Sequence, residues 1–417
     1  MARVGPRLPP ELLHYVLQDL DKPALTACAA VSHAWVELAR PYLFKSVVCV
    51  VYAIPGYDDP RYTLRGTDDR PASAFPLFAD FLESHTQVAA SIHTLELHTG
   101  SDGWYHGFDA VVRILRCLPR LQSLTFSGRP FHHDAPAEDP RATGTLPAIA
   151  HLGTLKIESI IYMPTSDLTC ILALFGSIAE LVFGEFVGRF APTQSPLVAA
   201  LPAPHVAALD LSHISLPGPV LVPGVEAWRV RALRLPEVSP YRAPALAAFL
   251  ARVAPTLQRL CFRAARGGPA RLDTAFAGLP VLPVLPVLTH LALPLLVAPA
   301  PDGAPGLCRD VYAGVLRALS DPPPALATLV LVLEPAPSPR AIGAGLLALQ
   351  RRAAPRAGGL PLRAFADVRG FEDACLRVGV RRVEVCAGAG HVLGARDKAE
   401  LGRGLPRLLA KGVLQFV

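Results

Sequence analysis

A short apolar motif recurs along most of this chain, and it restricts the folds that the sequence can adopt. The motif consists of an apolar residue, one spacer and a second apolar residue. Its first members are Leu95, Leu124, Leu155, Leu181, Leu209, Leu233, Leu260, Leu291 and Leu329. The first eight lie 24 to 31 residues apart, and the last step is 38 residues. A recurrence in this range predicts a solenoid, in which each unit covers the apolar face of its neighbour.

Helical stretches lie between these motifs, at residues 108–118, 168–175, 246–253 and 311–319. A strand followed by a helix in each step resembles the leucine-rich repeat. We therefore predict an α/β fold in which a leucine-rich-repeat-like α/β solenoid with a parallel sheet occupies residues 92–334. The repeats are degenerate, since the chain has no Asn, the residue that usually follows the strand in such repeats. A non-solenoid α/β domain is the alternative.

The residues before the array show a helical pattern instead. Its apolar positions in the first segment are Leu12, Leu13, Val16, Leu17 and Leu20. Pro9, Pro10 and Glu11 suit the first turn of that helix. A second apolar segment covers residues 24–31, and Ser32 is placed to cap a third helix that ends near Pro41. Three helices in about 40 residues bury too little apolar surface alone, so the pattern indicates docking.

This stretch resembles the F-box. The matching residues are Leu8, Pro9 and Glu11, the apolar positions of the first helix, Pro23 and Leu25, then Val31, Ser32 and Trp35, then Leu38 and Ala39, and finally Tyr42, Leu43 and Phe44. The resemblance implies binding of a small Skp-type adaptor, which links the motif to a cullin–RING ubiquitin ligase. It implies adaptor-facing or core positions for Leu8, Pro9, Leu12, Leu13, Val16, Leu17, Val31, Trp35 and Leu38. The sequence does not separate these two roles, and a helical cap with all of these side chains internal is the alternative.

Taken together, the two patterns resemble F-box proteins of the fungal type. The resemblance implies a non-catalytic, substrate-recognition subunit of a Skp–cullin–F-box ubiquitin ligase, whose solenoid binds a protein target. Two alternatives remain: a non-ligase interaction scaffold of leucine-rich-repeat type, and an enzyme on an α/β fold whose site the sequence does not reveal.

The predicted domains follow the change of pattern along the chain. Residues 1–46 form the F-box, and residues 47–91 contain the end of a strand (44–51), a polar loop (52–74) and a helix (75–85) that lead into the array. Residues 92–334 form the solenoid. Residues 335–417 form a C-terminal capping segment, with a possible helix at 344–352 and a strand at 381–386.

Two motifs resemble enzyme sites but lack the surrounding pattern. Gly388, Gly390 and Gly394 follow a predicted strand, as in dinucleotide-binding folds. A dinucleotide fold needs a βαβ unit followed by further parallel strands, and only about twenty residues remain after Gly394, so we expect no room for it, and no cofactor. The stretch from His132 to Asp134 lacks a third ligand at suitable spacing, so we expect no metal.

Composition limits the partners and the compartment. The eight cysteines are spread singly, which favours buried reduced thiols over disulfides or a zinc module. Residues 278–300 are uncharged but contain five prolines, so we expect buried strand-like pieces and no membrane span. A net charge of +6 without a basic run gives no reason to expect nucleic-acid binding. The first residues lack a signal-peptide pattern, and we expect a cytoplasmic or nuclear protein.

Overall fold

The computed structural model describes residues 10–50, 74–98, 108–127, 148–158, 162–184, 189–191, 203–212, 225–235, 243–262, 284–299, 305–307, 323–335, 368–387 and 393–417. The chain divides into two compact units, Met1–His205 and Val206–Val417. Leu8, Pro9, nearly all of the predicted 52–74 loop, His132–Asp134 and the predicted helices at 311–319 and 344–352 lie outside the described residues.

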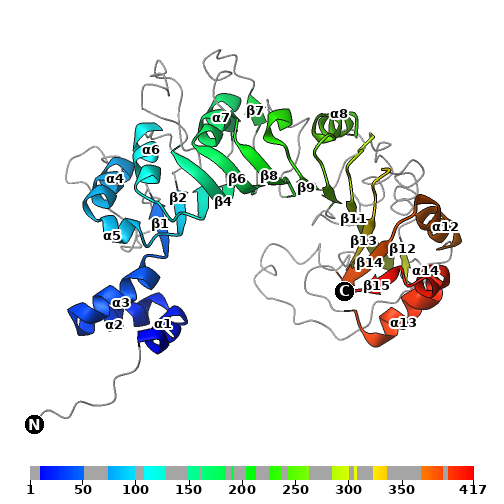
Figure 1. Cartoon of the computed structure of the whole chain (residues 1–417), viewed down its shortest axis with the longest axis horizontal. Helices are drawn as coiled ribbons and strands as arrows, with labels where there is room; N and C mark the ends of the chain where they lie inside the picture. The colour runs from blue at the N-terminus through cyan, green and yellow to red at the C-terminus, as the bar shows by residue number, and fades with distance from the viewer. Residues whose placement is uncertain are drawn as a thin grey trace, which may run out of the picture. The chain divides into compact units, whose positions relative to one another are not determined.

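The first unit begins with three helices and continues as alternating strands and helices (Figure 1). Its helices are α1 (Pro10–Gln18), α2 (Lys22–Val31), α3 (His33–Leu43), α4 (Ala74–Ser84), α5 (Thr86–Ala89), α6 (Phe108–Arg116) and α7 (Thr165–Ala173). Its strands are β1 (Ser46–Val50), β2 (Thr94–His98), β3 (Ser123–Ser127), β4 (Ile149–Glu158), β5 (Tyr162–Pro164), β6 (Phe175–Phe183) and β7 (Arg189–Ala191), and β8 (His205–Asp210) starts at the boundary.

The second unit repeats the same alternation (Figure 1). Its strands after β8 are β9 (Ala232–Leu235), β10 (Arg259–Phe262), β11 (His290–Pro299), β12 (Pro305–Leu307), β13 (Thr328–Pro335), β14 (Arg382–Ala387) and β15 (Leu414–Phe416). Its helices are the 3₁₀ helix η2 (Val225–Trp228), α8 (Ala243–Val253), α12 (Val368–Val378), α13 (Ala395–Gly404) and α14 (Pro406–Ala410).

The recurring leucines form an in-register ladder across the parallel strands of the first unit. Leu95 of β2 pairs with Val47 of β1 and Leu124 of β3, and the ladder continues to Leu155 and Leu181. All four leucines are fully buried. Alternate residues of a strand point to opposite faces, so the motif places its two apolar side chains in the core and the spacer on the other face, where Glu96 and Lys156 are partly exposed and Thr125 is buried.

The second unit continues the same pattern. Its ladder consists of Leu209, Leu233, Leu260, Leu291, Leu329, Val383 and Leu414, each paired in parallel with the next. The last two positions, in β14 and β15, lie in the predicted capping segment, where strands continue the sheet. Only β12 runs antiparallel among the described strands of this unit, and it pairs with β11. These features confirm an α/β solenoid-like arrangement with a parallel sheet.

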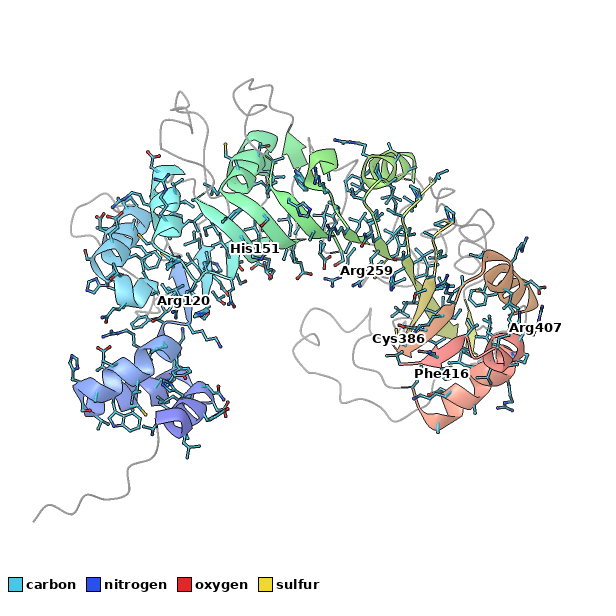
Figure 2. The ribbon with its side chains drawn as sticks, viewed as in Figure 1. Arg120, His151, Arg259, Cys386, Arg407 and Phe416 are labelled. Carbon is cyan, nitrogen blue, oxygen red and sulfur yellow. The ribbon has the colours of Figure 1, made fainter. Side chains whose placement is uncertain are left out.

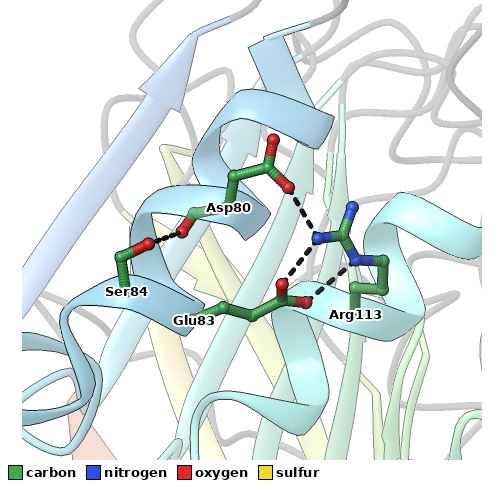
Figure 3. A network of polar contacts seen from close by, with 4 residues as sticks. All are labelled: Asp80, Glu83, Ser84 and Arg113. Carbon is green, nitrogen blue, oxygen red and sulfur yellow. Dashed lines mark hydrogen bonds and ion pairs between the residues drawn. The ribbon is translucent and has the colours of Figure 1, made fainter.

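Helices cover the core face of the strands in each unit (Figure 1). In the first unit, α4 and α6 are joined by an ion-pair network (Figure 3). Arg113 of α6 donates to Glu83 at 2.7 and 2.9 Å and to Asp80 at 2.6 Å, both on α4. The network fixes the relative position of the two helices over the sheet.

The third helix ends at Leu43, near Pro41 as predicted, and it continues past the proline because Phe44 still donates its backbone N–H to Arg40, 3.1 Å away. Proline removes one helical hydrogen bond, and the last turn tolerates that loss. Phe175 is not helical: it is buried and begins β6, opposite Ile149 of β4. Strand pairing outweighs the helical periodicity of residues 168–175.

The remaining predicted elements among the described residues are observed. These are the strand at 44–51, the helices at 75–85, 108–118 and 246–253, and the strand at 381–386. The predicted apolar pieces at 278–300 include β11. Within the part of the chain that the structure describes, every helix is too short or too polar to cross a bilayer.

Candidate functional site

The first helix exposes one apolar face to solvent. Leu12, Tyr15 and Val16 remain 49%, 65% and 54% exposed. Their i, i+3 and i+4 spacing places them on one side of α1. Exposing three large apolar side chains on one turn of a helix is unfavourable unless a partner covers them.

The opposite face of α1 forms the core of the three-helix unit. Leu17 is 1% exposed and packs with Leu25 of α2 and Ala39 of α3. Leu20 lies against the same core, and Leu13 is half-buried. The apolar residues of the first segment therefore serve two surfaces, and the structure separates the two roles that the sequence left together.

The turn between α2 and α3 exposes one further apolar side chain. Val31, at the end of α2, is 70% exposed. The next residue, Ser32, caps α3 as predicted, because its Oγ accepts the backbone N–H of Trp35 at 3.4 Å. Trp35 and Leu38 are half-buried and pack against the core. We refer below to Leu12, Tyr15, Val16 and Val31 as the exposed apolar set.

Polar contacts fix the helices to one another and to the first strand. His14 of α1 lies 2.9 Å from the hydroxyl of Tyr42 on α3. Lys22 donates to the carbonyl of Ser46 in β1 at 2.9 Å. Arg40 pairs with Glu37 at 2.7 Å and also contacts Gln87 of α5. These contacts hold the exposed apolar set on a defined scaffold.

The predicted site residues thus fall into three groups. Leu12, Val16 and Val31 are exposed, and Leu17 is buried; Leu13, Trp35 and Leu38 are intermediate. Leu8 and Pro9 lie outside the described residues. The exposures of Leu12, Val16 and Val31 do not fit a helical cap with all of these side chains internal. Tyr15 was not among the site residues predicted from the sequence, although its spacing of three from Leu12 is a signal that identifies it.

The glycines of the dinucleotide-type motif lie between β14 and α13. Strand β14 precedes these glycines, and α13, α14 and the parallel strand β15 follow them, so one strand–helix–strand unit forms around the motif. Among the described residues β15 is the one strand after the motif, and the further parallel strands of a dinucleotide fold are not observed. The buried Asp397 carboxylate accepts the backbone N–H of Gly394 at 3.0 Å. Residues 388–392 lie outside the described residues.

The described cysteines carry free thiols. Burial raises the pKa of Cys49 to about 12, and burial followed by the nearby Glu372 carboxylate raises the pKa of Cys375 to about 12. Both thiols therefore stay protonated near neutral pH, which removes the thiolate needed for nucleophilic or metal-binding chemistry. Among the residues that the structure describes, His, Cys, Asp and Glu do not gather in groups of three that could hold a metal ion.

Comparison with known families identifies the same segment. Residues 6–50 match the F-box-like family, and this range includes α1, α2, α3 and β1. No curated protein sequence matches the chain. F-box domains bind Skp-type adaptors, which agrees with a small helical unit that has a complete core and an additional exposed apolar set. The chain therefore carries an F-box-like domain at residues 6–50.

Proposed function

We propose that this protein is the substrate-recognition subunit of a Skp–cullin–F-box ubiquitin ligase. The observation that carries the proposal is the exposed apolar set on the F-box-like domain. Leu17, Leu25 and Ala39 already fill the core of that domain, so Leu12, Val16 and Val31 are available for a partner. A Skp-type adaptor is the partner whose binding would remove these side chains from water.

The adaptor-facing residues that we propose are the exposed ones. Leu12, Tyr15 and Val16 would contact the adaptor from α1, and Val31 would contact it from the end of α2. Leu17 acts from the core by positioning α1, and Trp35 and Leu38 position α3. Leu13 lies at the border of the two groups.

The α/β region is proposed to bind the protein target. In the leucine-rich-repeat-like region the spacer residues of the strands lie on the open face, so neighbouring strands present a continuous surface of side chains that are not needed for the core and can contact a target. In this proposal the protein contributes no catalytic residue. It raises the effective concentration of a bound target near the ubiquitin-loaded enzyme. The proposed compartment is the cytoplasm or nucleus, where such ligases act.

Co-purification with a Skp-type adaptor and a cullin tests the proposal. We expect the full chain to retain both proteins and the Val16→Asp variant to retain neither, because a buried unpaired carboxylate is costly. Ala27→Asp is the matched control, since Ala27 is exposed on α2 and is not a member of the exposed apolar set. If the full chain retains neither adaptor nor cullin, or if Val16→Asp retains both, the ligase proposal fails and an interaction scaffold becomes the better explanation.

A further inference from the structure

Arginines gather at the beginnings of three strands of the second unit. Arg231 precedes β9, Arg259 begins β10, Arg381 precedes β14 and Arg382 begins it; all four are exposed. Figure 2 shows Arg259 on the side of the strands away from α8. We refer to these four residues, with His290 at the beginning of β11, as the basic row.

The backbone pairing of the strands fixes the spacing of the basic row. Arg259 lies opposite His290, His290 opposite Thr328, and Thr328 opposite Arg382. Neighbouring strands lie about 4.8 Å apart, so the Cα atoms of Arg259 and Arg382 are about 14 Å apart. The carbonyl of Arg231 accepts the N–H groups of Gln258 and Arg259, both at 2.8 Å, which fixes Arg231 beside β10.

Most of this positive charge has no carboxylate partner within the described ranges of the second unit. Arg382 pairs with Glu384 at 2.6 Å. In the described part of the second unit, by contrast, no ion pair or side-chain hydrogen bond involves Arg231, Arg259 or Arg381. Among the residues that the structure describes, Arg231, Arg259 and Arg381 thus have no carboxylate partner, and each guanidinium group offers five N–H donors that suit a carboxylate.

We propose that the basic row binds an acidic, extended segment of a protein, and this inference rests on the proposed function because it gives the chemistry of the target. An extended peptide advances about 3.3 Å per residue, so two carboxylates four residues apart span about 13 Å. That distance matches the separation of the cations across three strand steps. Arg381 is the residue next to Arg382 at the beginning of β14, so Glu or Asp side chains at this spacing can reach Arg259 and Arg381 at the same time.

A peptide fits the row better than a nucleic acid does. Nucleic-acid grooves combine a continuous basic track with exposed aromatic side chains for base stacking. Here the cations are interrupted by Thr328, and the Glu384 carboxylate lies on the same face of β14. Phe262, the aromatic residue of β10, is buried. Separate carboxylates can avoid Glu384, whereas a continuous phosphate chain cannot.

Fluorescence anisotropy with the full chain tests the inference. The probe is a labelled seven-residue peptide with Glu at its second and sixth positions, compared with the same peptide carrying Gln at both. We expect the Glu peptide to bind more tightly and to weaken as salt rises from about 50 to 300 mM. We expect Arg259→Gln combined with Arg381→Gln to weaken binding about 2- to 30-fold, from two exposed ion pairs.

The control variant is Arg377→Gln, which removes an exposed arginine from α12. We expect it to bind the Glu peptide like the unmodified chain, and thermal unfolding should show that all variants are folded. Equal binding of the Glu and Gln peptides, an equal loss in Arg377→Gln, or tighter binding of single-stranded oligothymidine through Arg259 and Arg381 would overturn the inference. Adaptor binding, measured on the same samples, separates the two proposals: peptide failure with intact adaptor binding refutes only the basic row.

Discussion

Truncation of the exposed face of α1 gives the sharpest test of how the F-box-like domain divides its apolar residues. The perturbation is Leu12→Ala combined with Val16→Ala. Complete burial of a Leu or Val side chain is worth about 1.5–3 kcal/mol. Leu12 and Val16 keep 49% and 54% of their exposure, so an adaptor can still bury about half of each.

The expected loss follows from this remaining exposure. Half of the burial energy at each of two positions is about 1.5–3 kcal/mol in total, which weakens adaptor binding about 10- to 150-fold. The free energy of unfolding should change by less than about 1 kcal/mol, because both side chains lie at the surface. Isothermal titration calorimetry measures the affinity, and urea unfolding measures the stability.

The core variant Leu17→Ala should behave in the opposite way. Its side chain is 1% exposed, so truncation should lower the free energy of unfolding of the domain by about 2–5 kcal/mol. Where the domain remains folded, adaptor affinity should stay near that of the unmodified chain. Unchanged adaptor binding in the Leu12/Val16 double variant would refute the assignment of this face to the adaptor, as would a loss of stability equal to that of Leu17→Ala.

Three further predictions concern the α/β region. Glu372 is 2% exposed and accepts the backbone N–H groups of Arg407 and Leu408 at 2.8 and 3.0 Å. Glu372→Ala should lower the free energy of unfolding in urea by about 1–3 kcal/mol, and Glu372→Gln should lower it less. Equal losses in the two variants would contradict a stabilising role for the carboxylate. The hydrogen bond from Arg113 lowers the pKa of Glu83 below its ordinary 4.5. The stability that this pair contributes is therefore present above pH 4.5 and is lost as the pH falls through the lowered pKa. Arg113→Met should reduce the loss of stability on acidification, and an unchanged dependence of stability on pH would contradict this. Because the pKa of Cys375 is raised to about 12, its thiol should react with Ellman's reagent at pH 8 only after unfolding, and rapid reaction of this thiol in the folded chain would show that it is accessible.

The repeat pattern predicted the sheet well because its information is local. Leu95, Leu124 and Leu155 occupy the same core position in successive strands and pair with one another, so their recurrence in the sequence corresponds to the register of the sheet. The segments between strands vary in length without disturbing that register. The sequence did not indicate β15, because Leu414 lies in a strand of three residues whose pairing with β14 only the folded chain provides.

The candidate site was predictable as a segment, and its division into core and surface was not. Leu12, Val16 and Leu17 all satisfy the apolar spacing of one helix, and which side becomes core depends on where α2 and α3 pack. Tyr15 was overlooked for the same reason, since its role depends on exposure. The basic row is also a product of folding: Arg259 and Arg382 lie far apart in the sequence, and strand pairing brings them to the same edge.

Titration of a purified Skp-type adaptor into the full chain, followed by calorimetry, tests the central claim most directly. The exposed apolar set predicts saturable binding with one adaptor per chain, and a negative heat-capacity change because apolar surface is buried. A folded chain that releases no heat with the adaptor, and elutes separately from it on size exclusion, would contradict the claim that the F-box-like domain is an adaptor-binding module.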